Sequence, residues 1–387
     1  MDFTLSDEQR WFRDLAHKFA EQTIRPIAAE ADEKEEVPWE VLEKAHQMGL
    51  LSYYLPETYG GGGIESLLTK LLVDEELFWG CAGVGSILGA TALCATPILL
   101  AGTEEQKRRY LSRFCDPTKV TLGAFALTEP SAGSDVGALA TQVRRTQDKY
   151  ILNGQKTFIT NAGIADIYVV FATIDPSLKT KGITAFILEK DWPGVIPGKK
   201  EKKLGIRASH TAALAFENVE IPLENRLGAE GEGFQIAMRT FDITRTHTAI
   251  GAVGVARAAF EYALEYAQER EQFGKAIISF QAIAFMLADM AMKIDAARFL
   301  AWRAAWLKDR GQACTKEASM AKAYAADVAV EVTANAVQIL GGYGYMREYP
   351  VEKWMRDAKI MQIYEGTAQI QRLVIARQLT SPGKERG

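Results

Sequence analysis

Apolar residues recur at helical spacing through the first part of the chain. Trp11, Leu15 and Phe19 lie along one such stripe, and the capping pattern Ser6-x-x-Gln9 stands before it. This combination predicts a helix with one buried face, because Ser and Gln at this spacing satisfy the free amides of a helix start. Further helical segments follow Pro38 and the four glycines at 60–63. We therefore predict an N-terminal helical domain over residues 1–119.

Short β-rich runs replace this pattern after Pro117. Runs at 167–174, 183–188 and 212–219 are bounded by Pro, Gly, Asn and Asp, as strands commonly are. Asn153-Gly154 separates two further runs and predicts a tight hairpin turn, since both residues tolerate positive φ. We expect a middle β-domain of antiparallel strands over residues 120–228.

Helical spacing returns after Gly233. Ile283, Leu287 and Met290 fall on one buried helix face, and an alanine-rich run at 318–340 ends at Gly341-Gly342, a common helix C-terminus. These features predict a C-terminal four-helix bundle over residues 229–387. The predicted fold class is a multidomain α+β protein with a helical, then β, then helical order.

Composition narrows the class of protein. Of the 387 residues, 48% are hydrophobic and 24% charged, and the formal net charge is −4. This balance is ordinary for a soluble globular protein and gives no overall electrostatic reason to bind nucleic acid or an anionic membrane. The start of the chain lacks the features of a signal or transit peptide. We therefore expect a cytoplasmic protein.

Several catalytic and binding motifs are missing from the sequence. There is no G-x-G-x-x-G after a strand, no P-loop and no G-x-S-x-G elbow. The cysteines and histidines are scattered without C-x-x-C or metal-ligand spacing, which argues against a zinc site or a disulfide framework. These residues are Cys81, Cys94, Cys115, Cys314, His17, His46, His210 and His247. We expect no metal.

Glu365 is the main candidate for catalysis. It follows apolar residues in the segment 361–369 and precedes Gly366, which permits a sharp turn or the close approach of another molecule. A glutamate in apolar surroundings resists ionisation and suits general-base work. The alternative is a surface glutamate at the start of the last helix, where acidic residues are favourable. Taken alone, the segment leaves both interpretations open.

Three other segments allow ligand binding without requiring it. Residues 127–135 place hydroxyls and backbone amides between apolar runs, and residues 270–275 place cations beside a glycine at a helix end. Residues 341–345 are glycine-rich. Taken alone, a plain turn is the better explanation of 127–135. Favourable cations at a helix end explain 270–275 as well as anion binding does, and a helix C-cap is the alternative for 341–345.

Together these segments resemble the acyl-CoA dehydrogenase family, in the family's order and across essentially the whole chain. The motifs are Thr128-Glu129-Pro130 with Gly133-Ser134-Asp135, Asn153-Gly154-x-Lys156-x-Phe158-Ile159-Thr160-Asn161, Arg270-x-x-Phe273-Gly274, Gln338-Ile339-Leu340-Gly341-Gly342-x-Gly344 and Ile363-Tyr364-Glu365-Gly366-Thr367. The resemblance implies an FAD enzyme that introduces a trans double bond between Cα and Cβ of an acyl-CoA thioester. It implies that Glu365 removes the α-proton while hydride passes to flavin N5, and that an electron-transferring flavoprotein accepts the electrons.

The resemblance also assigns binding residues. Positions that contact FAD in the family are Phe125, Leu127, Thr128, Ser134, Phe158, Ile159, Thr160, Arg270, Phe273, Gln281, Gln338, Gly341, Gly342, Thr367 and Gln369. Positions near the acyl-CoA are Ser134, Asp242, Arg245, Gly366 and Arg377. Phe158 departs from the tryptophan usual there but keeps an aromatic wall. Arg270, Phe273 and Gln281 correspond to residues that bind the FAD of a neighbouring subunit, which implies a homotetramer.

Thr244 limits the branches of the family that remain. One branch carries its base at this position as a glutamate, so this chain resembles the short-chain, medium-chain, 2-methylacyl or glutaryl types instead. The small residues at 83–89 fall where the family lines the acyl tail, but they do not decide chain length. Two other functions stay open at this point: an acyl-CoA oxidase using O2, and a non-enzymatic helical-bundle binding protein.

Overall fold

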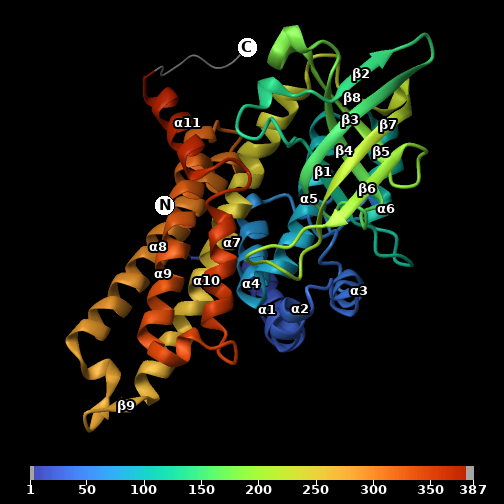
Figure 1. The fold of residues 1–387 in the computed structure, drawn as a ribbon. Coiled ribbons are helices and arrows are strands. Elements are labelled where there is room, and N and C mark those ends of the chain that lie inside the picture. Colours follow the sequence, from blue (N-terminus) through green and yellow to red (C-terminus); the bar gives the residue numbers. More distant parts are fainter. Residues whose placement is uncertain (1–3, 381–387) are drawn as a thin grey trace.

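The computed structural model describes residues 4–380, and helices form its N-terminal part (Figure 1). The predicted capping box is confirmed, because the Ser6 side chain accepts from the Gln9 amide, and a second capping box joins the Thr103 side chain to the Gln106 amide. A π-helical turn at Ala20–Ile24 and a 3₁₀ turn at Arg25–Ile27 link the first two helices. The helices are α1 (Asp7–Phe19), α2 (Ala28–Lys34), α3 (Trp39–Gln47), α4 (Leu67–Gly80), α5 (Ala82–Ala101) and α6 (Glu104–Phe114).

Helix α5 is apolar on nearly every side because the fold covers it. Its length and hydropathy alone would allow it to cross a membrane, the one such helix among residues 4–380, but 67% of its most apolar window is buried inside the protein. It packs against α4, the bundle and the first strand of the sheet. α5 therefore acts as a core helix where the three parts of the chain meet.

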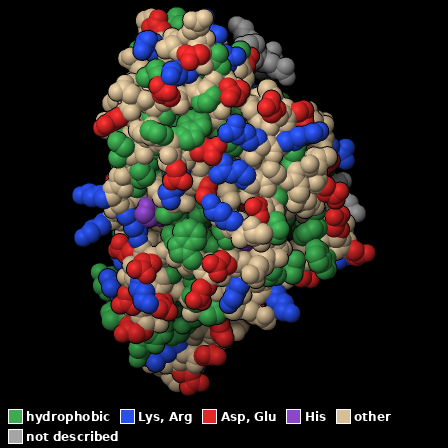
Figure 2. All heavy atoms as spheres, turned by 90° about the vertical axis from the view of Figure 1, so that its right-hand side faces the viewer, with side chains coloured by type: hydrophobic (Ala, Val, Ile, Leu, Met, Phe, Trp, Pro, Cys, Tyr) green, Lys and Arg blue, Asp and Glu red, His purple; other side chains and the backbone are tan. Residues whose placement is uncertain are grey.

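The middle part is a single large sheet with strand order β6-β7-β3-β2-β4-β5-β8, and β1 pairs with β4. Most pairings are antiparallel, but β1 and β2 run parallel to β4, which departs from the antiparallel prediction. The strands are β1 (Gly123–Ala126), β2 (Gln142–Arg145), β3 (Lys149–Thr160), β4 (Ile167–Thr173), β5 (Ile183–Glu189), β6 (Val195–Lys200), β7 (Thr211–Pro222) and β8 (Arg226–Leu227). Acidic and basic side chains are interspersed over the face in Figure 2, consistent with the small net charge.

The hairpin predicted at Asn153-Gly154 is wrong. β3 continues through both residues, and its pairing with β7 shifts register between Leu152 and Gly154. Gly154 has φ +143°, and an added Cβ would lie 2.7 Å from the Thr141 Cα. Asn153 exchanges hydrogen bonds with Asn218 on β7, at 2.8 and 3.1 Å. The dipeptide therefore forms a β-bulge, because the long partner strand pairs on both sides of it.

Long helices form the C-terminal bundle, confirming the predicted architecture (Figure 1). They are α7 (Gly233–Glu269), α8 (Gln281–Asp309), α9 (Thr315–Leu340), α10 (Val351–Met361) and α11 (Ala368–Thr380). A short hairpin, β9 (Glu271–Gln272) with β10 (Lys275–Ala276), connects α7 to α8. α4 packs against α7 and α8, and α5 packs against α7 and β1, so these two helices lie between the bundle and the sheet (Figure 1).

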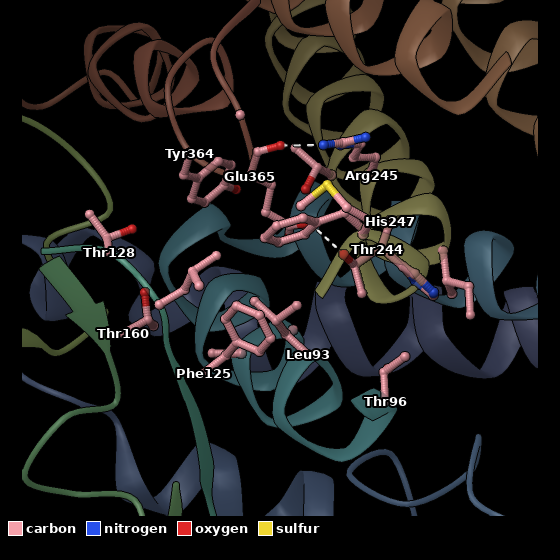
Figure 3. Close-up of a pocket in the computed structure, with 18 of the residues that line it drawn as sticks. Leu93, Thr96, Phe125, Thr128, Thr160, Thr244, Arg245, His247, Tyr364 and Glu365 are labelled. Carbon is pink, nitrogen blue, oxygen red and sulfur yellow. Dashed lines mark hydrogen bonds between the residues drawn. The ribbon is translucent and has the colours of Figure 1, made fainter. Parts of the chain in front are cut away.

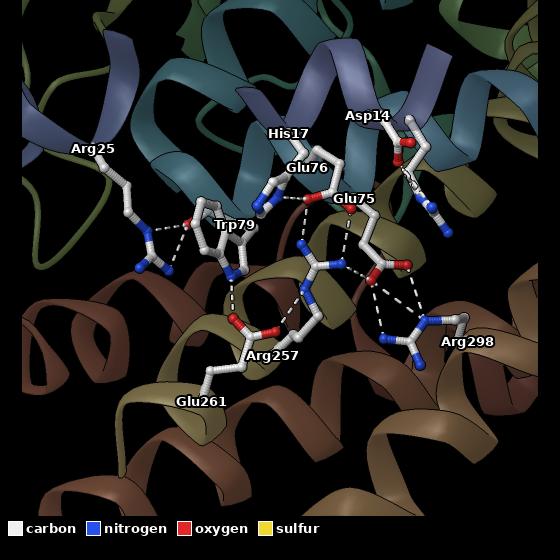
Figure 4. Close-up of polar contacts among 10 residues, drawn as sticks. Asp14, His17, Arg25, Glu75, Glu76, Trp79, Arg257, Glu261 and Arg298 are labelled. Carbon is white, nitrogen blue, oxygen red and sulfur yellow. Dashed lines mark hydrogen bonds and ion pairs between the residues drawn. The ribbon is translucent and has the colours of Figure 1, made fainter. Parts of the chain in front are cut away.

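A buried network of charges fastens α4 to the bundle (Figure 4). Glu75 and Glu76 on α4 are each 3% exposed. Arg257 of α7 donates to both carboxylates, at 2.9 and 2.8 Å. Arg298 of α8 contacts Glu75 at 3.0 Å, and His17 of α1 contacts Glu76 at 2.8 Å. Burial alone would raise the pKa of Glu76, but Arg257 and His17 hold it below the usual carboxyl value. The network thereby places the helices that line the cavity described below.

Candidate active site

A cavity of about 940 Å³ lies where the helices, the sheet and the bundle meet (Figure 3). Its walls come from α4, α5, β1, β3, α7, α11 and the segment between α10 and α11. A cavity of this size that is built from several elements is the usual setting for a small-molecule site.

Glu365 reaches this cavity from the segment between α10 and α11. The Thr244 hydroxyl on α7 donates to Glu365 Oε2 at 2.6 Å. Sequence reasoning treated these two positions as rival sites for the base, whereas the structure makes them hydrogen-bond partners. Because the donor fixes one carboxylate oxygen, the orientation of the carboxylate in the cavity is defined.

The backbone around Glu365 has an unusual conformation. Glu365 has φ +53° and the following Gly366 has φ +90°, so both occupy the left-handed region. Side chains from three elements hold the two carbonyls. Gln371 on α11 donates to the Glu365 and Gly366 oxygens at 3.2 and 3.0 Å, and Arg245 on α7 donates to the Glu365 oxygen at 3.4 Å. Lys322 on α9 donates to the Gly366 oxygen at 2.7 Å.

The sheet supplies the opposite wall of the cavity. Phe125 and Leu127 come from β1 and the turn after it, and Phe158 and Ile159 come from β3, each lining the cavity. The Phe158 side chain is 68% exposed and its φ is +56°, so the backbone turns this ring out of the sheet. The hydroxyl-bearing Thr128 and Thr160 line the same wall (Figure 3). The wall therefore combines aromatic rings with hydrogen-bonding groups.

A buried ion pair lies behind this wall. Lys156 of β3 is 2.6 Å from Glu129, and both side chains are almost completely buried. Glu129 also accepts from the amides of Ala140 and Thr141 at 2.6 and 3.0 Å. Burial by itself would raise the pKa of Glu129, but Lys156 and these amides lower it. The pair ties the loop between β1 and β2, which carries Thr128 and Ser134, to β3.

Helix α5 lines a largely apolar part of the cavity. Leu88, Gly89, Ala90 and Leu93 face it, with Thr96 farther along the helix. Two glycines of the predicted acyl-tail segment allow close packing of neighbouring groups. A Cβ added at Gly83 would lie 2.9 Å from the Ala208 side chain, and one added at Gly85 would lie 2.6 Å from the Phe78 ring.

Models of three acyl-CoA dehydrogenase domains match the chain. The N-terminal domain matches residues 6–117, the middle domain 124–219 and the C-terminal domain 231–380. The chain belongs to the acyl-CoA dehydrogenase family. It is accordingly an FAD-dependent enzyme of acyl-CoA dehydrogenation. The limits predicted for the three domains, 1–119, 120–228 and 229–387, stay predictions.

Known relatives and solved structures match this chain over almost its full length. A short-chain specific acyl-CoA dehydrogenase of Clostridium acetobutylicum is 48% identical over 377 residues, covering 97% of this chain and 99% of the relative. The butyryl-CoA dehydrogenase structure of Megasphaera elsdenii matches with a TM-score of 0.95 and 48% identity, covering 98% of this chain and 100% of that one. A chain in a structure described as the electron transferring flavoprotein of Acidaminococcus fermentans matches with a TM-score of 0.95 and 49% identity, covering 98% and 99%.

The cavity of this acyl-CoA dehydrogenase fits the flavin of FAD. Phe125, Phe158 and Ile159 offer apolar surface for a flat ring, and Thr128 and Thr160 offer hydroxyls at its polar edge. Phe125 is itself held by Phe171 and Phe241, with ring centroids 4.8 and 5.6 Å apart. Ser134, Arg245, Gly366 and Arg377 line the same cavity. Asp242 is outside its lining and bonds to the Thr315 hydroxyl at 2.7 Å.

The remaining predicted FAD residues lie elsewhere on the chain. Arg270 and Gly342 line a second cavity, of about 500 Å³, at the end of α7 and α9. Phe273 is 93% exposed, and Gln281 and Gln338 are also exposed. The others are Gly341, which follows α9, and Thr367 and Gln369 at the start of α11. In a single chain, the wall formed by Phe125 and residues 158–160 (the flavin wall) therefore shares the main cavity with Glu365, whereas the remaining predicted FAD residues lie outside that cavity.

Sequence reasoning missed three residues that the fold brings to the site. Lys322 and Gln371 support the Glu365 segment, and Asp74 on α4 contacts His247 at the cavity wall. Lys322 is a single charge in an alanine-rich helical pattern and Asp74 begins the acidic run 74–76, and no local signal separates either from surface residues.

Proposed function

We propose that this protein oxidises short-chain acyl-CoA thioesters to trans-2-enoyl-CoA with Glu365 as the base. One observation carries the proposal: Glu365, hydrogen-bonded to Thr244, lines the same cavity as residues 158–160. The names of the full-length relatives, short-chain specific and butyryl-CoA dehydrogenase, support the choice of substrate length.

The chain's own groups account for removal of the α-proton. The Glu365 carboxylate lines the cavity and accepts from the Thr244 hydroxyl, so we assign it as the acceptor of the α-proton of a thioester bound there. We assign the backbone N–H of Glu365 as a donor to the thioester carbonyl, where charge develops as the proton leaves. Bound FAD supplies the acceptor for the hydride of the β-carbon.

Residues at the rim of the cavity are proposed to hold the coenzyme A part. Ser134 lines the cavity from the loop after β1, and Arg377 lines it from helix α11. Arg377 is exposed and can pair with a phosphate. Arg245 and Gly366 lie close to Glu365. Asp242, also on α7, accepts a hydrogen bond from the Thr315 hydroxyl.

We propose that the active form is a homotetramer in which subunits share FAD sites. Arg270, Phe273 and Gln281 are exposed or line the second cavity, so a neighbouring subunit can meet them. The apolar Phe285 and Met292 on α8 are 60% and 63% exposed and lie seven residues apart on one helix face. We further propose an electron-transferring flavoprotein as the acceptor, supported by the similarity to a chain in such a protein's structure.

Anaerobic addition of acyl-CoA esters to the FAD-loaded protein tests the proposal. We expect butyryl-CoA to bleach the flavin fastest, with slower bleaching by octanoyl-CoA and longer esters. Failure of every chain length to bleach the flavin would refute the dehydrogenase function, and a maximum at octanoyl-CoA would refute the short-chain assignment. Release of peroxide in air at the turnover rate would identify an oxidase instead.

A further inference from the structure

Lys322 is a buried cation in the middle of α9. It has no exposed surface, and its neighbours on the buried helix face include Ala318, Ala325 and Ala326. Two other buried lysines have a carboxylate at contact distance: Lys156 and Lys353 each lie 2.6 Å from an acidic partner. Within residues 4–380 Lys322 forms no ion pair, and its ammonium donates to the Gly366 carbonyl at 2.7 Å.

Burial of the charged Lys322 side chain lowers the stability of the fold. Burial lowers the pKa of Lys322 to about 8; Glu365 and Asp327 oppose that shift, and Arg245 adds to it. A folded-state pKa below the unfolded value means that the protonated lysine opposes folding at neutral pH. A methionine of similar length would fill the same alanine-lined space without a charge. Stability therefore does not explain why a lysine stands here.

The contact that Lys322 makes is to the segment that carries the base. Its acceptor belongs to Gly366, the second residue of the left-handed pair at 365–366. A non-glycine residue in this conformation persists only when its surroundings enforce it. Gln371 bonds the same oxygen with a neutral amide, so Lys322 provides the charged and stronger of the two bonds.

We propose that Lys322 is a positioning residue that holds the Gly366 carbonyl and so maintains the turn directing Glu365 into the cavity. The proposal rests on the proposed role of Glu365 as base. The lysine touches neither substrate nor reacting atoms. It acts through the backbone of the residue next to the base.

Hydrogen exchange tests the positioning without any activity. Lys322→Met is compared with Lys316→Met, which removes a half-exposed lysine from the same helix. We expect the amides of residues 362–371 to exchange at least tenfold faster in Lys322→Met and at the wild-type rate in Lys316→Met. We also expect the Lys322→Met protein to unfold at the same temperature as the wild type or higher, because it loses a buried charge. Wild-type exchange in this segment would overturn the proposal.

The rate of anaerobic flavin reduction by butyryl-CoA gives the functional consequence. We expect Lys322→Met to lower the limiting rate at least tenfold with little change in the dissociation constant, and Lys322→Arg to restore most of it. A loss that follows lower FAD content or thermal stability, with no rescue by arginine, would overturn the proposal. If the wild type itself does not reduce its flavin while the exchange result holds, the proposed function fails and the positioning stands.

A pH profile of the wild type and Lys322→Arg tests the same proposal if Lys322→Met does not fold. The charged groups that face Lys322 are Glu365, Arg245 and Asp327. In the wild type, kcat/KM should fall as pH rises through about 8, where Lys322 loses its proton. Arginine does not titrate there, so in Lys322→Arg the fall should move to higher pH. Identical alkaline limbs in the two proteins would count against the proposal.

Discussion

Positive φ marks three non-glycine residues among the predicted site residues. Phe158, Phe273 and Glu365 have φ of +56°, +54° and +53°, although none is a glycine. Such backbone costs of order 1–3 kcal/mol for each residue and persists where surrounding contacts enforce it. The Phe158 and Glu365 side chains line the cavity, whereas the Phe273 side chain faces solvent.

At the residue scale, Glu365→Gln isolates the role of the carboxylate. Glutamine keeps the shape and can still accept from Thr244, but it cannot take a proton. We expect flavin reduction by butyryl-CoA to slow about 100- to 10,000-fold, the usual contribution of a general base. FAD content and unfolding temperature should match the wild type. A variant retaining a tenth of the wild-type rate would show that the base lies elsewhere.

At the scale of elements, the loop between β1 and β2 depends on its buried anchor. Glu129 joins the loop's two ends by accepting from Ala140, Thr141 and Lys156. The segment from 128 to 134 is otherwise rich in small and hydroxyl residues that favour turns over a fixed shape. The ion pair therefore decides where Thr128 and Ser134 stand.

We expect Glu129→Gln to destabilise the fold by about 3–5 kcal/mol at pH 7, because it leaves the Lys156 charge buried without a partner. The pKa of Glu129 is lowered in the fold. Its contribution is therefore complete above the usual carboxyl pKa of about 4.5 and is lost as pH falls through the folded value. Denaturant unfolding at several pH values should show the gap between the two proteins closing in acid.

The double variant Glu129→Gln/Lys156→Met serves as the control for the charge. It should recover most of the lost stability at pH 7, because neither partner then remains charged. A double variant as unstable as Glu129→Gln would mean that packing or the amide contacts carry the effect, rather than the ion pair.

At the scale of the whole molecule, one chain brings only some of the predicted FAD residues to the main cavity. The flavin wall and Glu365 share a cavity, while Arg270, Phe273 and Gln281 lie outside it with the exposed apolar stripe of α8 nearby in sequence. A monomer would expose both the apolar stripe and the Phe273 ring to water. In the proposed homotetramer, association through α8 would cover the apolar stripe, and Arg270, Phe273 and Gln281 would contact the FAD of a neighbouring subunit.

We expect Phe285→Glu/Met292→Glu to dissociate the assembly and to lower its FAD content together. Light scattering gives the mass, and the absorbance of the flavin gives occupancy. Ile196→Glu on β6 is the matched control, since Ile196 is also exposed, at 42%, but lies in the middle sheet. Monomers that hold FAD as tightly as the wild type would contradict shared sites.

Local patterns determined the elements and the broad architecture. Ser6 and Thr103 start helices because capping satisfies amides within four residues, and the stripe through Leu287 and Met290 faces the core because a helix repeats every few residues. The same reasoning failed at Asn153-Gly154. Turn propensity is local, whereas the pairing of β3 along β7 is set by residues more than fifty positions away.

The motifs around Thr128, Phe158 and Glu365 carry the family resemblance, so the family and its reaction class could be predicted from the amino-acid order alone. The contacts that hold these groups could not, because they join residues far apart in the chain. Thr244 meets Glu365 across 121 positions and Lys322 meets Gly366 across 44. Such contacts depend on how α7 and α9 pack beside the last segment, and packing is a property of the whole core. The buried charge of Lys322 acquires its role from that arrangement alone.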